Sequence, residues 1–232
     1  SLDELLLVVE ANRYPGSLTV QSITAGGQAL SEFALESNRL TLPLLQSLDP
    51  GAALTLALEY TLVLPEIPEP SDTARPQPYG FTLRQANLVD WYPYLPPYDD
   101  EKGWLAPEPG YFGEHQVLPL ANFHLTLRVP EIGTPLTVAA SAPAEQQGDA
   151  NHYTLPAARS FALSISPMYQ VLSGMVGDIT VYSYCFSYDT EGGQAALDHT
   201  LQAMALYQEL FGPYPHATLS IVQADFLDGM EL

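Results

Sequence analysis

The sequence predicts a mainly β protein, an antiparallel β-sandwich followed by a short α+β segment. Two observations lead to this prediction. Over residues 1–188, short runs of alternating apolar and polar residues follow one another, with turn residues and no helical period between them. Such spacing is typical of antiparallel sandwiches. After Tyr188 the apolar period changes from about two residues to about 3.6, the period of an amphipathic helix.

The first strands are predicted at residues 5–9, 18–21, 40–42 and 54–64. The first run is short and is preceded by acidic residues, which makes it a poor signal peptide and a good strand; any signal would lie upstream. In residues 54–64 every second residue is apolar or aromatic, so this strand has one buried and one solvated face. Turn residues separate the runs at Gly26-Gly27, Ser37-Asn38 and Asp49-Pro50-Gly51.

A loop-rich segment is predicted over residues 65–122. It holds eleven of the twenty-one prolines, which cannot donate to a β-ladder and therefore prevent long strands. It is also rich in tyrosine, phenylalanine and tryptophan, a composition that argues against a flexible linker. We therefore expect a structured insertion that packs on the sandwich.

Later strands show the same alternation, at residues 123–129, 137–140, 161–166 and 179–188. Cys185 lies in the last of them and is expected to be a small core residue. It is the only cysteine of the chain, so no intrachain disulfide can form.

A helix is predicted over residues 194–210, followed by a strand over 217–224. Asp189 or Thr190 is expected to cap its start, and Gly212-Pro213 to end it. One helix and one strand are too little for a domain, so we expect an all-β domain over 1–188 and the beginning of a second domain over 189–232. Leu197, Leu201, Met204, Tyr207 and Phe211 are predicted to fall on one face of this helix.

The charge balance excludes some classes of partner. The chain has 27 acidic and 7 basic residues and a net charge of −20. Binding of nucleic acid is therefore excluded, because phosphate contacts need clustered lysine and arginine. No apolar run approaches the ~18 residues that cross a bilayer, so we expect no membrane insertion within this chain. The excess of acidic residues is interpreted as favouring solubility.

No complete catalytic motif is present. There is no glycine-rich phosphate loop, nucleophile elbow or Cys-x-x-Cys pair. None of the five histidines lies in His-Glu-x-x-His, the spacing that holds zinc on one face of a helix. The acidic run 99–101 lacks the spacing of a calcium loop and is interpreted as a solvated turn. We therefore assign no catalytic residue and no metal ligand in this chain.

The end of the chain carries a family resemblance. The predicted helix runs into Phe211-Gly212-Pro213-Tyr214-Pro215-His216, a strand follows, and then comes Asp228-Gly229-Met230-Glu231. This order resembles the opening of the catalytic domain in aminopeptidase N-like zinc metallopeptidases, the gluzincins. The first domain of bacterial members is similar to five earlier segments: Asp90-Trp91-Tyr92-Pro93, Tyr98-Asp99, Gly103-Trp104, Gly113-Glu114 and Ala121-Asn122-Phe123.

The resemblance implies a saddle-like β N-terminal domain before the start of a thermolysin-like catalytic domain. In the family, the Glu of the Met-Glu motif binds the free α-ammonium of a peptide substrate by a charge-assisted hydrogen bond. By resemblance Glu231 does so here, while Gly229 and Met230 line the substrate with their backbone. By the same resemblance, Gln85 corresponds to a second residue that binds the substrate amine in the family. The partners implied are peptides whose N-terminal residue the parent protein hydrolyses.

The family's zinc ligands follow this motif, whereas the present sequence ends before them. Zinc is therefore expected in the full-length parent, where it would activate water, and neither zinc nor activity is expected in this chain alone. Asp228 and Leu232 depart from the family motif, which leaves open a member with altered or lost activity. The usual location of members of this family and the presence of a single lysine, Lys102, favour an extracytoplasmic location.

Two other interpretations stay open. One is a stand-alone β-sandwich that binds carbohydrate or a protein ligand, with Trp91, Tyr94 and Trp104 as a stacking platform. The other is a scaffold member of the family without the zinc motif. The helix and strand after residue 188 favour the peptidase fragment. They would be the start of its second domain, whereas a stand-alone binding module does not explain why they are there.

Overall fold

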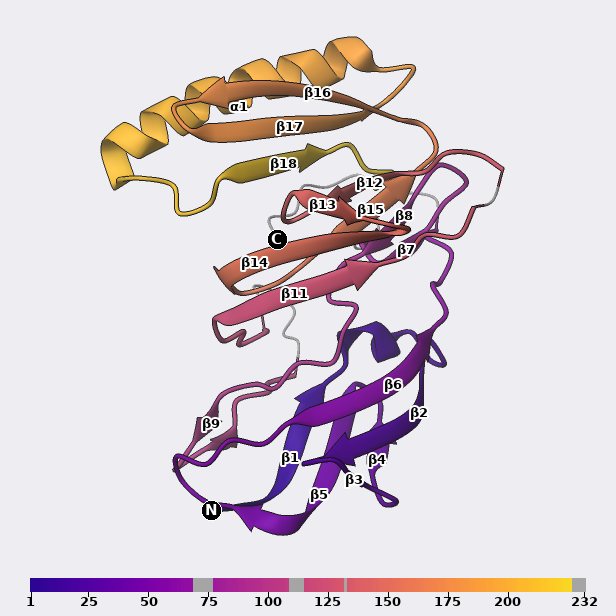
Figure 1. Ribbon diagram of the computed structural model, residues 1–232, viewed down its shortest axis with the longest axis vertical. Helices are drawn as coiled ribbons and strands as arrows, with labels where there is room; N and C mark the ends of the chain where they lie inside the picture. The colour runs from indigo at the N-terminus through magenta and orange to yellow at the C-terminus, as the bar shows by residue number, and fades with distance from the viewer. Residues whose placement is uncertain (69–76, 109–114, 132, 227–232) are drawn as a thin grey trace. The chain divides into compact units, whose positions relative to one another are not determined.

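The computed structural model describes residues 1–68, 77–108, 115–131 and 133–226 (Figure 1). Strands predominate in this part of the chain, and most of them pair antiparallel. The predicted mainly β, antiparallel fold is therefore confirmed. The chain divides into two compact units, and the segment predicted as one insertion contributes to both. Residues 1–65 and 90–120 form the first unit, and residues 66–89 and 121–232 form the second.

The first unit contains two three-stranded antiparallel sheets, β1-β5-β4 and β3-β2-β6. Alternate residues of these strands point inward, as the period-two pattern predicts, and meet in one core. The strands are β1 (Leu2–Val8), β2 (Leu18–Ala25), β3 (Gln28–Ala29), β4 (Ala34–Glu36), β5 (Arg39–Leu48) and β6 (Leu56–Leu62), and the short 3-10 helix η1 (Glu10–Arg13) follows β1. The buried core residues are Leu5, Leu7, Val9, Leu18, Ile23, Leu30, Leu40 and Leu42.

Aromatic residues of the loop-rich segment take part in the packing of this unit. Tyr94 exchanges two backbone hydrogen bonds with Val8, of 2.8 and 2.9 Å. Trp104 packs against the core, and its ring meets that of Tyr98 edge-on at 5.0 Å. Trp104 and Tyr98 both lie in a small hairpin of β9 (Tyr98–Asp99) and β10 (Gly103–Trp104). Asp99 stabilises the hairpin turn, since its carboxylate accepts two backbone N–H bonds of 2.9 and 2.8 Å.

The second unit contains three sheets, β12-β15-β8-β7, β11-β14-β13 and β16-β17-β18. The pairs are antiparallel apart from β17-β18, which is parallel. The strands are β7 (Gly80–Phe81), β8 (Ala86–Leu88), β11 (Ala121–Leu127), β12 (Thr137–Ala140), β13 (Ala144–Gln147), β14 (Ala150–Ala158), β15 (Leu163–Ser166), β16 (Tyr169–Val176), β17 (Ile179–Phe186) and β18 (Thr218–Val222).

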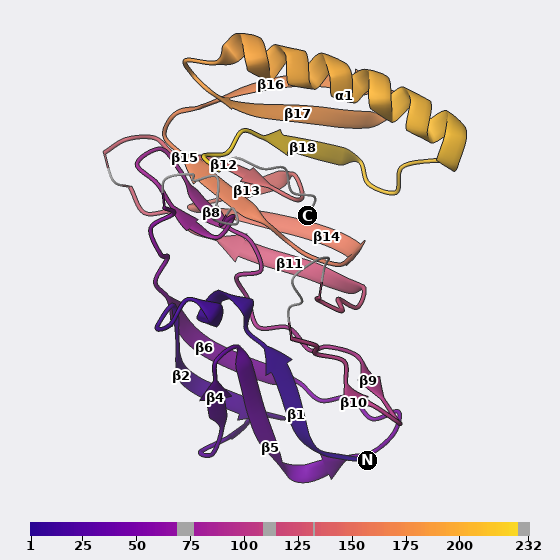
Figure 2. The same cartoon turned by 180° about the vertical axis from the view of Figure 1, so that it is seen from behind.

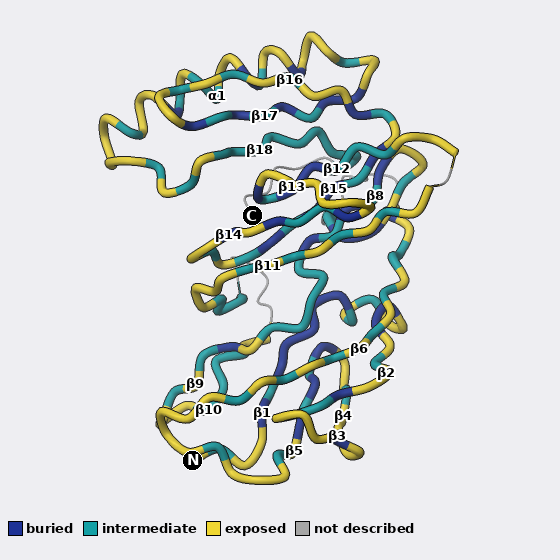
Figure 3. The backbone as a smooth tube through the Cα atoms, viewed as in Figure 1, coloured by how far each residue is buried: buried dark blue, intermediate teal, exposed yellow. Residues whose placement is uncertain are grey.

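The helix α1 (Thr190–Phe211) connects the two parallel strands β17 and β18. It packs on β16 and β17, along one face of their sheet (Figure 2). Strand β17 is more buried than β16, and its alternate residues from Ile179 to Cys185 are all buried (Figure 3). Strand β18 thus extends the sheet of β17, and the predicted domain boundary near residue 189 stays a prediction.

The ends of α1 follow the predicted signals. Asp189 is the N-cap and accepts from the backbone N–H of Gly192 at 3.3 Å. Gly212, with φ of 97°, closes the C-terminus in a conformation that favours glycine. The helix begins at Thr190, before the predicted start at residue 194, and Gly193 packs directly on Cys185, where any side chain would overlap the cysteine. No helix in the described ranges is long and apolar enough to cross a membrane.

Candidate functional site

The candidate site is built around Gln85, because it is the one predicted site residue that the structure describes. Gly229, Met230 and Glu231 lie outside the described residues. Gln85 is 3% exposed and ends the tight turn between β7 and β8. Three of its neighbours on the second unit, Thr82, Asn87 and Asp225, determine how its side chain is held.

Thr82 shapes the turn that carries Gln85. Its backbone N–H donates to the Gln85 carbonyl at 2.8 Å, which closes the turn. Its hydroxyl oxygen accepts from the backbone N–H groups of Arg84 and Gln85 at 3.1 and 3.3 Å. A threonine hydroxyl that accepts from following backbone donors is a common way to stabilise a turn. The Gln85 side chain therefore leaves a rigid support.

The carboxamide of Gln85 is hydrogen-bonded at both ends. Its Nε2 donates to Asn87 Oδ1 at 2.7 Å, and its Oε1 accepts from the backbone N–H of Asp225 at 3.1 Å. Asp225 stands six residues before Glu231 in the sequence. The fold thus brings Gln85 to the stretch of chain that leads into the Gly229–Glu231 motif.

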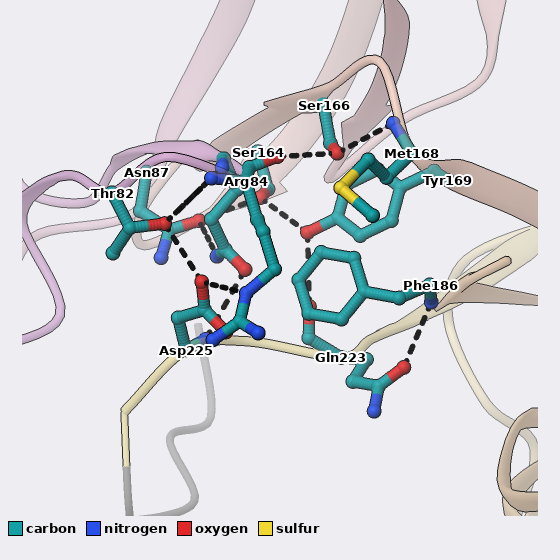
Figure 4. Close-up of polar contacts among 11 residues, drawn as sticks. Thr82, Arg84, Asn87, Ser164, Ser166, Met168, Tyr169, Phe186, Gln223 and Asp225 are labelled. Atoms are coloured by element: carbon teal, nitrogen blue, oxygen red, sulfur yellow. Dashed lines mark hydrogen bonds and ion pairs between the residues drawn. The ribbon is translucent and has the colours of Figure 1, made fainter. Parts of the chain in front are cut away.

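The side chain of Asp225 is held by the same turn (Figure 4). Its Oδ2 accepts from the Thr82 hydroxyl and from Arg84 Nε, both at 2.7 Å. The Asp225 side chain is 8% exposed, whereas that of Arg84 is 47% exposed. A charge-assisted bond to arginine is stronger than a neutral one. Together with the backbone bond to Gln85, it fastens the end of β18 to the β7-β8 turn.

Aromatic rings support Arg84 from the other side. The guanidinium carbon lies 5.7 Å from the centre of the Phe186 ring and 6.0 Å from that of Tyr188. These two rings stack at 5.6 Å, and Tyr169 stacks on Phe186 at 5.4 Å. Cation–π contacts of this kind contribute about 0.5–1 kcal/mol at exposed sites. Arg84 is therefore oriented by rings as well as by Asp225.

A chain of buried polar groups continues behind Asn87. Its Oδ1 accepts from the Ser164 hydroxyl at 2.5 Å, and Ser164 lies 2.9 Å from the Tyr169 hydroxyl. Tyr169 in turn donates to the carbonyl oxygen of Gln223 at 2.9 Å. Burial raises the pKa of Tyr169 to about 12, so the phenol is a neutral donor at ordinary pH.

Sequence reasoning missed most of this site. Gln85 was found only through the family resemblance, and Arg84 and Asp225 lie 141 residues apart. A lone Asp after a predicted strand and a lone Arg in a turn carry no local signal of pairing. A hydropathy pattern also cannot predict that Asn87 and Ser164 are buried, because asparagine and serine are mostly exposed in proteins.

The described part of the site contains hydrogen-bond acceptors and one cation, Arg84, whose guanidinium group is held in place. Among the residues that the structure describes, no three His, Cys, Asp or Glu side chains come together as they would around a metal ion. These residues therefore do not fit zinc, and no catalytic step through a metal is derived from them.

Solved structures share the fold of this chain. The M1 zinc metallopeptidase from Deinococcus radiodurans matches with a TM-score of 0.56 and 16% identity, over 95% of this chain and 48% of that one. A mutant of it bound to a Tyr-Ser-Ala substrate matches with a TM-score of 0.55 and 15% identity over the same shares. This chain shares its fold with about half of each of these two metallopeptidase chains. No protein-family model and no curated protein matches the sequence.

A longer aminopeptidase also shares the fold of this chain. Aminopeptidase A from Legionella pneumophila, in complex with aspartic acid, matches with a TM-score of 0.57 and 16% identity, over 95% of this chain and 24% of that one. The present chain thus spans about half the length of the Deinococcus enzymes and about a quarter of the Legionella enzyme. At this identity, the likeness to the M1 metallopeptidases establishes the fold.

Proposed function

We propose that this chain is the N-terminal part of a zinc-dependent aminopeptidase-like protein, whose parent hydrolyses N-terminal residues from peptides. The observation that carries the proposal is the match of 95% of the chain to M1 zinc metallopeptidases of about twice its length. One of these structures holds a Tyr-Ser-Ala substrate, and others hold L-arginine or L-tryptophan. Peptides with a free N-terminus are therefore the proposed substrates.

The proposed amine site consists of Glu231, with Gly229 and Met230 as backbone lining and Gln85 as a second acceptor. The bond from Asp225 N–H to Gln85 Oε1 supports this grouping, since it ties Gln85 to the chain that runs toward the motif. A carboxamide oxygen has two lone pairs, so Oε1 keeps one for a further donor. An α-ammonium group, which has only donors, is complementary to a carboxylate and an amide oxygen.

Zinc belongs to the proposed parent and not to this chain. The 232 residues contain no His-Glu-x-x-His, and we propose that the chain alone is inactive. When bound in the parent, the metal would lower the pKa of a water molecule and polarise the scissile carbonyl. What this chain would contribute is recognition of the amine end of the peptide.

A scaffold member of the family without activity is the alternative, because Asp228 and Leu232 depart from the family motif. The natural sequence beyond Leu232 separates the two proposals. A His-Glu-x-x-His with a Glu downstream, within a few dozen residues, supports the peptidase, and a chain without it rules the peptidase out.

The second test is biochemical. The longest natural polypeptide that contains this chain is expected to bind zinc and to hydrolyse aminoacyl-anilides, and a chelator should abolish the activity. The 232-residue chain, measured in parallel, should hold no stoichiometric zinc and release no anilide. Zinc-dependent turnover by the 232-residue chain would show that the metal site has been placed wrongly.

A further inference from the structure

The last two turns of α1 carry apolar side chains that are largely exposed. Every buried residue of this helix, which the structure describes in full, lies at or before Met204. The four large apolar side chains beyond it are 50–81% exposed: Leu206, Tyr207, Leu210 and Phe211. Figures 1 and 2 show the reason, since the end of α1 runs past the ends of β16 and β17. The sheet that covers the first part of α1 therefore does not reach its last part.

Two apolar stripes follow one another along α1. The first packs on the sheet, where Gly193 contacts Cys185 and Leu201 lies against Gly174. The second stripe begins at Ala203, and its other members follow three, four, seven and eight residues later, which is the spacing of one apolar helix face. They are Leu206, Tyr207, Leu210 and Phe211. A second stripe of this kind is typical of a helix that packs on a second partner.

The charged residues of α1 lie on another side of the helix. They are Glu191, Asp198 and Glu209, which follow one another at intervals of 7 and 11 residues, close to two and three turns. All three are exposed. The five residues of the second stripe carry no charge, in a chain whose net charge is −20. Depletion of charge together with aromatic residues is typical of the core of a protein interface.

A second copy of this chain does not suit the second stripe well. Two chains that each have a net charge of −20 repel one another. Four partly exposed side chains also offer less than the about 800 Å² per partner that a stable complex typically buries. A segment of the same polypeptide needs less contact area, because the covalent connection gives it a high effective concentration. The small area and the charge therefore favour a covalently joined partner.

We propose that the second stripe is the surface on which the following part of the parent polypeptide packs. The existence of that part rests on the proposed function, in which this chain corresponds to about half of each Deinococcus metallopeptidase chain. The occupant is an apolar face without charged residues, because a charge placed against these side chains would be buried without a partner. The rings of Tyr207 and Phe211, whose centres lie 5.8 Å apart, form the main contact.

Cysteine labelling tests whether the second stripe is covered. Leu210→Cys places a thiol on the stripe, and Gln202→Cys places one on the charged side as a matched control, while the native Cys185 is buried. In the 232-residue chain both introduced thiols should react with a maleimide at similar rates. In the longest natural polypeptide, Leu210→Cys should react at least about tenfold more slowly, because labelling then requires local opening, and Gln202→Cys should react as before. Equal rates for Leu210→Cys in the two polypeptides would overturn the proposal.

A charge on the second stripe gives an independent measurement. Lysine is a good helix former and is favourable near a helix C-terminus. Leu210→Lys should therefore leave the midpoint of thermal unfolding of the 232-residue chain within about 2 °C of the wild-type value. In the longest natural polypeptide it should lower the midpoint by at least about 4 °C, because the ammonium group would be buried without a partner. Equal shifts in the two polypeptides would contradict the proposed contact.

Sedimentation of the 232-residue chain tests the other occupant. The chain should remain monomeric over a wide range of concentration, and a dimer that slows the labelling of Leu210→Cys would make a second copy the occupant and overturn the proposal. These measurements need neither substrate nor metal. A protected stripe in a longer polypeptide that cleaves no peptide would refute the proposed function and leave this contact intact. Aminopeptidase activity with an unprotected stripe would refute the contact and leave the proposed function intact.

Discussion

Arg84 and Asp225 are joined by a hydrogen bond of 2.7 Å between Nε and Oδ2, across 141 residues of sequence. The bond connects the turn between β7 and β8 with the segment after β18. Asp225 is nearly buried and Arg84 is half exposed, so the pair is partly shielded from water and salt. The Thr82 hydroxyl donates to the same carboxylate oxygen. This carboxylate is therefore one point at which the segment after β18 is held, and the carbonyl of Gln223, which accepts from Tyr169 at 2.9 Å, is another.

Removal of this carboxylate should destabilise the protein. Asp225→Ala leaves Thr82 and Arg84 without their shared acceptor and should lower the free energy of unfolding by about 1–2 kcal/mol. Urea denaturation followed by circular dichroism measures the loss. The control is Asp149→Ala, which breaks the pair with Arg128 at 3.5 Å, where both side chains are well exposed. That change should lower it by less than about 0.5 kcal/mol. Equal losses would contradict the role given to Asp225.

Gly193 should tolerate no larger residue. A Cβ at this position would overlap the Cys185 side chain, so Gly193→Ala should lower the free energy of unfolding by about 3 kcal/mol. Gly177 is the comparison, because its φ is 58° and a Cβ there meets no atom within 4 Å. Gly177→Ala should therefore lower the free energy of unfolding by about 1–2 kcal/mol, through the backbone conformation alone. A smaller loss for Gly193→Ala than for Gly177→Ala would show that α1 can move away from β17.

Alkaline pH should destabilise the protein through Tyr169. Burial raises its pKa to about 12 in the folded state, from an ordinary value of 10.0. Its contribution to stability is therefore complete below about pH 10 and is lost as the pH rises through about 12. The loss should amount to about 2–3 kcal/mol. Urea unfolding of the wild type and Tyr169→Phe across this range measures it, and the variant should show the weaker decline. Identical pH profiles would argue against an ionisation coupled to unfolding at Tyr169.

Recognition of the substrate amine is tested in the longest natural polypeptide. Glu231→Gln removes the charge proposed to bind the α-ammonium, a bond of about 1.5–3 kcal/mol, so kcat/KM for aminoacyl-anilides should fall at least about tenfold. Gln85→Leu should raise KM by a smaller factor, since a neutral acceptor is lost. The control is Glu131→Gln, at an exposed position. An unchanged KM in both test variants would remove these residues from the amine site.

Much of the local structure could be predicted from the sequence. The strand over 137–140 has the bounds that its alternation predicts. The cap at Asp189 and the stop at Gly212 mark the ends of α1 as expected. Cys185 is buried in β17, as its place in an alternating pattern indicates. These features depend on neighbours within a few residues, whose backbone and side-chain geometry is repeated regularly along a strand or helix.

Pairing between distant segments could not be predicted in this way. The parallel register of β17 and β18 depends on how α1 packs between its two ends. The assignment of residues 66–89 to one unit and 90–120 to the other depends on long-range contacts that no local pattern records.

At the candidate site, too, local features could be predicted and contacts between distant segments could not. A resemblance of motifs singled out Gln85, yet only the tertiary structure brings Asn87 to its nitrogen and Asp225 to its oxygen. The sequence by itself determined the positions of α1 and of strands such as β12 and β17, because these follow from local periodicity and capping, whereas β13, β14 and β16 were not predicted. The tertiary structure decided which polar groups are buried together, because a buried donor must find its acceptor wherever the closed chain places one.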